Sequence, residues 1–243
     1  MLGHHAEMVG LIVPGGWEEF FRFIGEPYDG AAWPTEDPRN FFEVLLPKLK
    51  AAAEKFDMIP CPQHIACQPG EWTAKDNRLP GSLQPYFLKN GTGPAYALGG
   101  TVLRPLTTTA ETDGKFSIAS LEGSSNANLQ TSLFTHSGRR LKFSGVHHAF
   151  QVVEGAASFA IGSRRPSRVC AGELVYVPKD TEFTLEFASR YAKVYIFVNG
   201  QGIVGLLQDL GQAFRQPMLP ETAVRWDESS LESAGSAVGL QFV

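Results

Sequence analysis

From Tyr96 onward, the chain is a succession of short apolar runs, each bounded by glycine, proline or other turn residues. The runs that read as strands cover residues 96–106, 116–123, 127–136, 143–155, 156–162, 172–178, 181–189 and 192–199. Many short strands at close intervals are typical of an antiparallel sandwich or barrel. The sequence therefore predicts an all-β domain over residues 96–215, with a helix at its end over residues 203–216.

The residues before this domain follow a different pattern. Residues 7–13 (EMVGLIV) predict a strand, and the aromatic residues of 17–24 recur at helical spacing. A second helix is predicted over residues 38–56, with Asp37 as its N-cap and Pro38 at its first position. Pro47 predicts a break or kink in it. Residues 57–95 are rich in proline, glycine and asparagine, which predicts a long irregular connector.

Composition and charge exclude several classes of protein. The 243 residues carry a net charge of −4, which gives no reason to expect binding to nucleic acid or to an anionic membrane. No apolar run is long enough to span a membrane, and the first residues lack the features of a secretory signal. Three cysteines cannot all pair within the chain, which favours free thiols and a reducing compartment. We therefore expect a cytoplasmic protein.

Two segments carry the most specific pattern in the chain. Residues 141–162 read LKFSGVHHAFQVVEGAASFAIG, and residues 172–187 read GELVYVPKDTEFTLEF. Together they resemble the paired motifs of the cupin superfamily, whose small RmlC-like jelly-roll β-barrels often hold one divalent metal ion. In that family, the first motif supplies two histidines and a glutamate as ligands, and the second motif supplies a third histidine.

The resemblance implies that this chain has kept the barrel and lost the ligands. When the motifs are aligned on the turn Glu154-Gly155, the ligand glutamate falls on His148 and the last ligand histidine falls on Phe183. The two earlier histidines fall near Lys142 and Ser144, or on Leu141 and Phe143 if the spacing is one residue longer. His148 and His136 are the metal-ligand candidates that remain, with Glu154 as a conceivable third group. His147 should face the other side of the sheet, because successive side chains on a strand alternate.

A further resemblance concerns the N-terminal part. The run PGGWEEFFRFIGEPY, residues 14–28, looks like the end of the first domain of fungal bicupins of the quercetin 2,3-dioxygenase-like group. In that group, the catalytic metal (copper, iron, nickel or manganese) lies in the first cupin domain, and the second is commonly metal-free. The resemblance implies four parts of this chain. These are a remnant of the first domain (1–30), a linker with a helix (31–95), the second barrel (96–215) and a C-terminal tail (216–243) that is a short helix or partly disordered.

Three functional hypotheses follow. By resemblance, the chain is part of a dioxygenase, an oxidoreductase acting on flavonol-like or other enolic aromatic substrates. It lacks most of the first domain, which a truncated gene model, an alternative transcript or a degenerate relative would explain. In that case it has no catalytic residue and no cofactor of its own. The alternative is a non-enzymatic module that binds a hydrophobic small molecule or a partner subunit. A third hypothesis is an active cupin with a rearranged metal site around His136 and His148.

Two further expectations concern binding. The inward-facing residues His148, Phe150, Val152 and Phe183 either line a cavity for a small aromatic ligand or form a filled core. The apolar segment 7–24 would lack its natural partners in this chain and would leave apolar surface exposed, which predicts a homodimer through the N-terminal segment or poor solubility.

Overall fold

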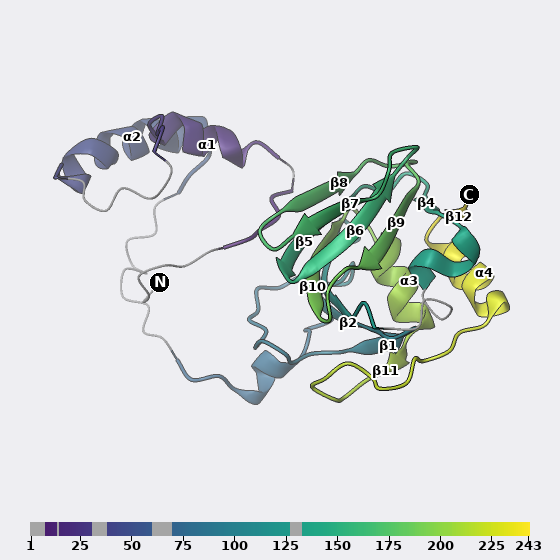
Figure 1. The fold of residues 1–243 in the computed structure, drawn as a ribbon. Helices are drawn as coiled ribbons and strands as arrows, with labels where there is room; N and C mark the ends of the chain where they lie inside the picture. Colours follow the sequence, from purple (N-terminus) through teal and green to yellow (C-terminus); the bar gives the residue numbers. More distant parts are fainter. Residues whose placement is uncertain (1–7, 14, 31–37, 60–69, 127–132) are drawn as a thin grey trace. The chain divides into compact units, whose positions relative to one another are not determined.

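The computed structural model describes residues 8–13, 15–30, 38–59, 70–126 and 133–243. The chain divides into two compact units, Met1–Gly70 and Glu71–Val243 (Figure 1). No helix of the described ranges is long and apolar enough to cross a membrane.

The larger unit consists of two antiparallel sheets, which confirms the predicted all-β class. One sheet has the strand order β11-β1-β2-β3-β10-β5-β8, and the other has the order β12-β4-β9-β6-β7. The two sheets remain separate in strand pairing, so they form a jelly-roll sandwich rather than one closed barrel. The strands are β1 (Tyr96–Leu98), β2 (Thr101–Thr107), β3 (Ser117–Gly123), β4 (Leu141–Phe143), β5 (His148–Glu154), β6 (Ala156–Ile161), β7 (Ser167–Cys170), β8 (Leu174–Val177), β9 (Phe183–Phe187), β10 (Ala192–Val198), β11 (Gln212–Ala213) and β12 (Leu240–Phe242).

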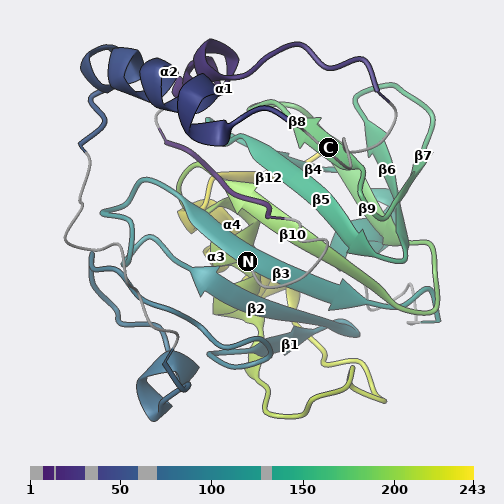
Figure 2. The ribbon, with the colours of Figure 1, turned by 90° about the vertical axis from the view of Figure 1, so that its left-hand side faces the viewer.

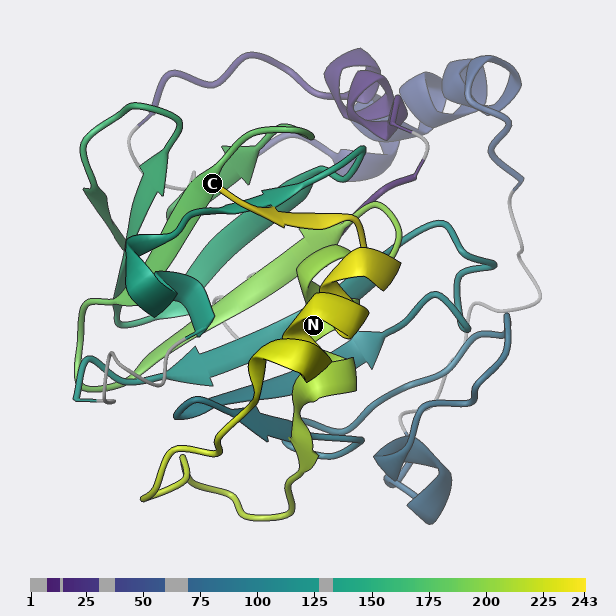
Figure 3. The same ribbon diagram turned by 90° about the vertical axis from the view of Figure 1, so that its right-hand side faces the viewer.

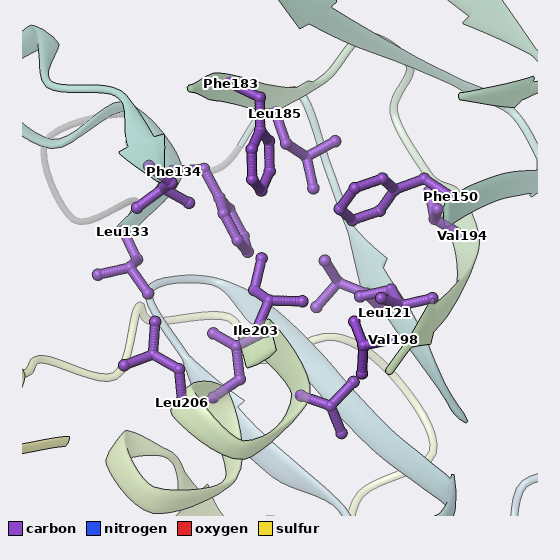
Figure 4. Packing of buried hydrophobic residues seen from close by; sticks show 14 of the residues in the cluster. Leu121, Leu133, Phe134, Phe150, Phe183, Leu185, Val194, Val198, Ile203 and Leu206 are labelled. Atoms are coloured by element: carbon purple, nitrogen blue, oxygen red, sulfur yellow. The ribbon is translucent and has the colours of Figure 1, made fainter. Parts of the chain in front are cut away.

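Large apolar side chains fill the space between the two sheets. Strand β10 shows why the sequence places them there, because Val194, Ile196 and Val198 alternate with less buried residues along a period of two. Figure 4 shows Phe150, Phe183 and their neighbours from both sheets pointing toward one another. Each of these side chains is almost fully buried, so the centre of the fold is a packed apolar core.

Two helices complete this unit. Helix α3 (Gly202–Leu210) follows β10 and buries Ile203, Val204, Leu206 and Leu207. Helix α4 (Glu228–Ala237) lies next to α3, and Figure 3 shows it leading into β12. The Asp227 side chain caps α4 by accepting a hydrogen bond from the Ser230 N–H.

The C-terminal region confirms one prediction and corrects another. The helix predicted over 203–216 ends at Leu210, because Gly211 adopts an extended conformation and β11 then pairs with β1. Of the two alternatives for the C-terminal tail, the short helix is confirmed by α4, and β12, which pairs with β4 along three residues, was not predicted. The compact unit therefore runs from 71 to 243, beyond both ends of the predicted barrel.

One predicted strand is wrong in its described part. Of the run 127–136, residues 127–132 lie outside the described residues, and Leu133–Gly138 form the 3₁₀ helix η4. Leu133 and Phe134 are buried in the core from this single turn, so their apolar character reflects packing rather than strand pairing. In contrast, β7 was not predicted, because only Val169 of its four residues is buried.

The described part of the smaller unit forms the helices α1 (Trp17–Ile24) and α2 (Phe41–Lys55), which contact each other. The predicted helix 17–24 is confirmed. Phe20 is its buried residue: its ring stacks on Trp17 with centroids 4.5 Å apart and meets the ring of Phe56 edge-on at 5.7 Å. The aromatic spacing therefore marks the face that packs against the second helix.

Three details of the N-terminal prediction need correction. Residues 8–13 form no strand, since no described residue hydrogen-bonds to them as a neighbouring strand. Helix α2 starts at Phe41 and is capped by Asn40, whose Oδ1 accepts the Phe42 N–H at 3.0 Å; the predicted cap Asp37 lies outside the described residues. Pro47 does not break α2, whose other hydrogen bonds and packing outweigh the missing donor. In its described part, the connector forms the short 3₁₀ helix η2 (Ala74–Asn77).

We predict that the smaller unit drives reversible self-association. Phe21 and Leu46 are 57% and 43% exposed, and Met8 is 82% exposed, so apolar surface is open to solvent. Sedimentation velocity of the purified chain should show a monomer–dimer equilibrium that Phe21→Ser shifts toward monomer. Leu83→Ser, a change at a 70% exposed leucine of the other unit, should leave the equilibrium as it is. A wild-type chain that stays monomeric at high concentration would contradict this prediction.

Candidate functional site

Three strands bring together the positions that the resemblance aligns with cupin metal ligands. Strand β4 ends at Phe143, β5 starts at His148, and β9 starts at Phe183. Leu141 of β4 pairs directly with Phe183. The centroid of the His148 ring lies 4.7 Å from the centroid of the Phe143 ring and 5.7 Å from that of Phe183, so these rings are in contact. The topology of the sandwich therefore preserves the meeting point of the two motifs.

Aromatic rings occupy this meeting point. We call Phe143, His148, Phe150, Phe159 and Phe183 the aromatic cluster. Phe150 contacts Phe183 at 5.5 Å and Phe159 at 5.2 Å between centroids, and it stacks parallel to the imidazole of His148 at 6.0 Å. All five side chains are buried, four of them at 1% exposure or less. Such tilted and offset ring pairs add to the stabilisation from apolar burial.

The environment of His148 explains why the imidazole is tolerated in this apolar cluster. Its Nε2 atom accepts a hydrogen bond from the backbone N–H of Ile203 at 3.2 Å. This N–H belongs to the first turn of α3, where backbone donors have no partner within the helix. Burial lowers the pKa of His148 to about 3, although a backbone hydrogen bond with Val146 acts in the opposite direction. The ring is therefore neutral, with Nε2 as the acceptor.

Gly202 allows this close contact. A Cβ atom at position 202 would lie 2.7 Å from His148 Nε2 and 2.9 Å from Val146 Cγ1, which is too close. The backbone there also has a φ of +46°, a conformation that glycine adopts at little cost. Glycine at position 202 is therefore required for the first turn of α3 to approach the His148 imidazole this closely.

At the aromatic cluster, the residues that the structure describes do not fit a divalent metal ion. A cupin-like metal site needs about three protein donors with an open position for water or substrate. Among the described residues, no three His, Cys, Asp or Glu side chains are grouped so that they could hold a metal ion. The nitrogen lone pair of His148 that would bind a metal already accepts the Ile203 N–H, and the neighbours of the ring are phenylalanines.

The other residues considered from the sequence lie elsewhere. The half-buried His147 is on the opposite side of β5, where its Nδ1 lies 2.6 Å from the Tyr176 hydroxyl and accepts the Lys179 N–H at 3.3 Å. Glu154 is exposed at the end of β5. His136 lies in η4, and its side chain is outside the described part of the structure, so a site that includes it stays a prediction.

The four predicted inward-facing residues are all in the core. His148, Phe150, Val152 and Phe183 are at most 1% exposed and belong to one continuous apolar cluster. Their mutual ring contacts favour the filled core over the cavity. Sequence reasoning did not find the role of Ile203, because the contact between residues 148 and 203 joins two segments 55 residues apart.

Comparisons with known proteins agree with the predicted resemblance. No protein-family model matches the chain. The chain is 27% identical over 223 residues to quercetin 2,3-dioxygenase of Aspergillus japonicus, covering 84% of this chain and 61% of that protein. It is 42% identical over 48 residues to quercetin 2,3-dioxygenase of Bacillus subtilis, covering 20% of this chain and 14% of that protein. The chain thus spans less than two thirds of the length of these curated relatives.

Two solved structures similar to the chain come from other organisms. One is a predicted oxalate decarboxylase of Thermotoga maritima, with a TM-score of 0.36 and 11% identity over 44% of this chain and 91% of that chain. The other is an RmlC-like cupin of Methanocaldococcus jannaschii, with a TM-score of 0.31 and 13% identity over 42% of this chain and 82% of that chain. It is the sequence comparisons that confirm the predicted resemblance of this chain to the quercetin 2,3-dioxygenase-like cupins.

Proposed function

We propose that residues 71–243 form a metal-free cupin unit of a quercetin 2,3-dioxygenase-like protein, and that this unit has a structural and binding role rather than a catalytic one. One observation carries the proposal. At the position where the cupin motifs converge, the imidazole of His148 accepts a backbone hydrogen bond, and Phe143, Phe150 and Phe183 surround its ring.

The electrostatics of the aromatic cluster support a non-catalytic role. A general base must exchange a proton at working pH, and burial lowers the pKa of His148 to about 3, far below neutral pH. The same burial separates the ring from any substrate in solvent, since His148 is 1% exposed. The dioxygenase activity that the relatives' name implies, cleavage of a flavonol by dioxygen, is therefore assigned to residues outside this unit.

Metal analysis tests this proposal. The purified chain is incubated in turn with copper, iron, nickel, manganese and zinc salts and then desalted. Elemental mass spectrometry should find no stoichiometric retention of any metal, and the loaded samples should not consume quercetin under air. Wild-type protein and His148→Gln should give the same result.

The matched control is His147→Gln, which changes the neighbouring, more accessible imidazole. Stoichiometric metal that is lost in His148→Gln and retained in His147→Gln would overturn the proposal and indicate an active cupin with a rearranged site. Metal that is lost in His147→Gln alone would indicate surface binding and leave the proposal in place.

A further inference from the structure

A cavity of about 280 Å³ lies on the outer face of the seven-stranded sheet, away from the aromatic cluster. Strands β2, β3 and β10 form its floor, and Figure 2 shows these three strands side by side with α3 and α4 behind them. The connector segment Leu88–Thr92 forms its other wall. The sheet contributes Arg104, Leu106, Ser120, Lys193 and Tyr195.

The strand register gathers the polar side chains of this floor. Arg104 pairs with Ser120, and Ser120 pairs with Tyr195, so the three residues form one row across β2, β3 and β10. In the next row, Glu122 pairs with Lys193. Residues two apart on a strand share a face, so both rows point to the same side of the sheet.

The charges in the cavity are predominantly positive. No lining residue is acidic, while Lys89, Arg104 and Lys193 are basic. The charge of Arg104 is compensated by Glu122, whose Oε1 accepts a hydrogen bond from the Arg104 Nε at 3.3 Å. Lys193 makes no ion pair with a carboxylate of the described residues, although it pairs in register with Glu122 on β3 and Glu154 on β5. Its ammonium lies 5.9 Å from the centre of the Tyr195 ring. The three basic residues that line the cavity outnumber these two neighbouring carboxylates, so net positive charge remains for an anionic group.

Ser120 provides a second polar contact. Its side chain is only 2% exposed, and it lines the cavity. Its hydroxyl is open to the cavity and hydrogen-bonds to none of the residues that the structure describes. A hydroxyl that is accessible from the cavity and has no partner among the described residues can donate to a ligand.

The shape and the remaining walls restrict the kind of anion. Leu88, Leu106 and the Tyr195 ring supply apolar surface that suits a flat ring. The volume is at the small end for ligand pockets, which suits a molecule with a single ring.

We propose that this cavity binds a small aromatic carboxylate. Lys193 holds the carboxylate by charge, Ser120 donates a hydrogen bond to it, and Leu88, Leu106 and Tyr195 cover the ring. Arg104 stabilises the floor of the cavity, because it donates hydrogen bonds to the Glu122 carboxylate and, at 3.2 Å, to the Gln216 carbonyl. This site is independent of the aromatic cluster, so it stands whether or not the unit binds a metal ion.

Isothermal titration of the full chain with benzoate tests the proposal. Benzoate should bind saturably, and benzamide, which has the same ring without the charge, should bind at least about tenfold more weakly. Lys193→Gln should weaken benzoate binding by about tenfold or more, since a charge-assisted contact is lost. Lys179→Gln, a change at an exposed lysine outside the cavity, should leave benzoate binding unchanged.

Ser120→Ala is the second variant, because it removes only the hydroxyl and keeps the strand intact. It should weaken benzoate binding by about threefold to tenfold, as expected for one hydrogen bond. Saturable benzoate binding that neither Lys193→Gln nor Ser120→Ala weakens would overturn the assignment of the site. Absence of saturable binding, or equal binding of benzamide or inorganic phosphate, would overturn the proposed ligand class.

Discussion

Replacing Phe183 by alanine should lower the free energy of unfolding of the larger unit by about 3–5 kcal/mol, the range for a phenylalanine truncated in a packed core. Phe183 is fully buried, and its ring contacts Phe143, His148 and Phe150. The substitution removes these contacts and leaves a void that the paired strands β4 and β9 cannot close. Urea unfolding followed by far-UV circular dichroism measures the loss.

Two controls give this experiment its meaning. Phe87→Ala removes the same atoms at a position that is 75% exposed, and it should change the free energy of unfolding by less than about 0.5 kcal/mol. Phe183→Leu keeps apolar volume and should cost much less than the alanine variant. If Phe183→Ala cost little, the centre of the sandwich would be a cavity, and the alternative of an aromatic ligand bound there would gain support.

The parts of the fold that the sequence predicts are those in which a local pattern coincides with burial. Strand β10 alternates apolar and polar residues, and α1 carries its aromatic residues at helical spacing; both were predicted within about one residue. The two cupin-like motifs also fall where the resemblance implies, on β4 to β6 and on β8 to β9. In each case, one continuous segment of the chain contains the whole signal.

The parts that the sequence does not predict depend on distant partners. Strand β12 forms by pairing with the edge of β4, which lies almost a hundred residues earlier in the chain. Strand β7 has little apolar character of its own and follows the edge of β6. Conversely, the apolar residues Leu133 and Phe134 look like part of a strand but pack into the core from a single 3₁₀ turn. Tertiary packing outweighs local propensity at all of these positions.

The same distinction applies to the sites. The inward orientation of His148 follows from its position in the first motif. Its acceptor role does not, because the donor Ile203 lies on a helix that the motif does not include. The outer cavity was not found from the sequence either, since Arg104, Ser120 and Lys193 are dispersed along the chain and only the strand register assembles them.

Acid should destabilise the larger unit through His148. The folded state holds this imidazole neutral, with a pKa of about 3, whereas the model value for an exposed histidine is 6.5. Below pH 6.5, the unfolded chain therefore binds a proton that the folded chain excludes, and stability falls as the pH decreases toward 3. Each pKa unit corresponds to about 1.4 kcal/mol, so the loss from this residue should reach about 3 kcal/mol at pH 4.5.

Comparison of variants isolates this contribution from that of the carboxylates. Asp227, whose pKa is lowered to about 2 chiefly by a hydrogen bond from Ser229, also responds to acid, but it does so equally in every variant. Urea unfolding of wild-type protein and His148→Gln is therefore measured from pH 7.5 to pH 4.5. As the pH falls, the free energy of unfolding should decrease more for the wild-type protein than for His148→Gln. Glutamine retains an acceptor for the Ile203 N–H and cannot be protonated in this range.

His147→Gln leaves His148 in place and should keep the wild-type dependence on pH. Parallel curves for wild-type protein and His148→Gln would mean that the imidazole is solvated and free to carry a proton, and His148 would again be available as a metal ligand.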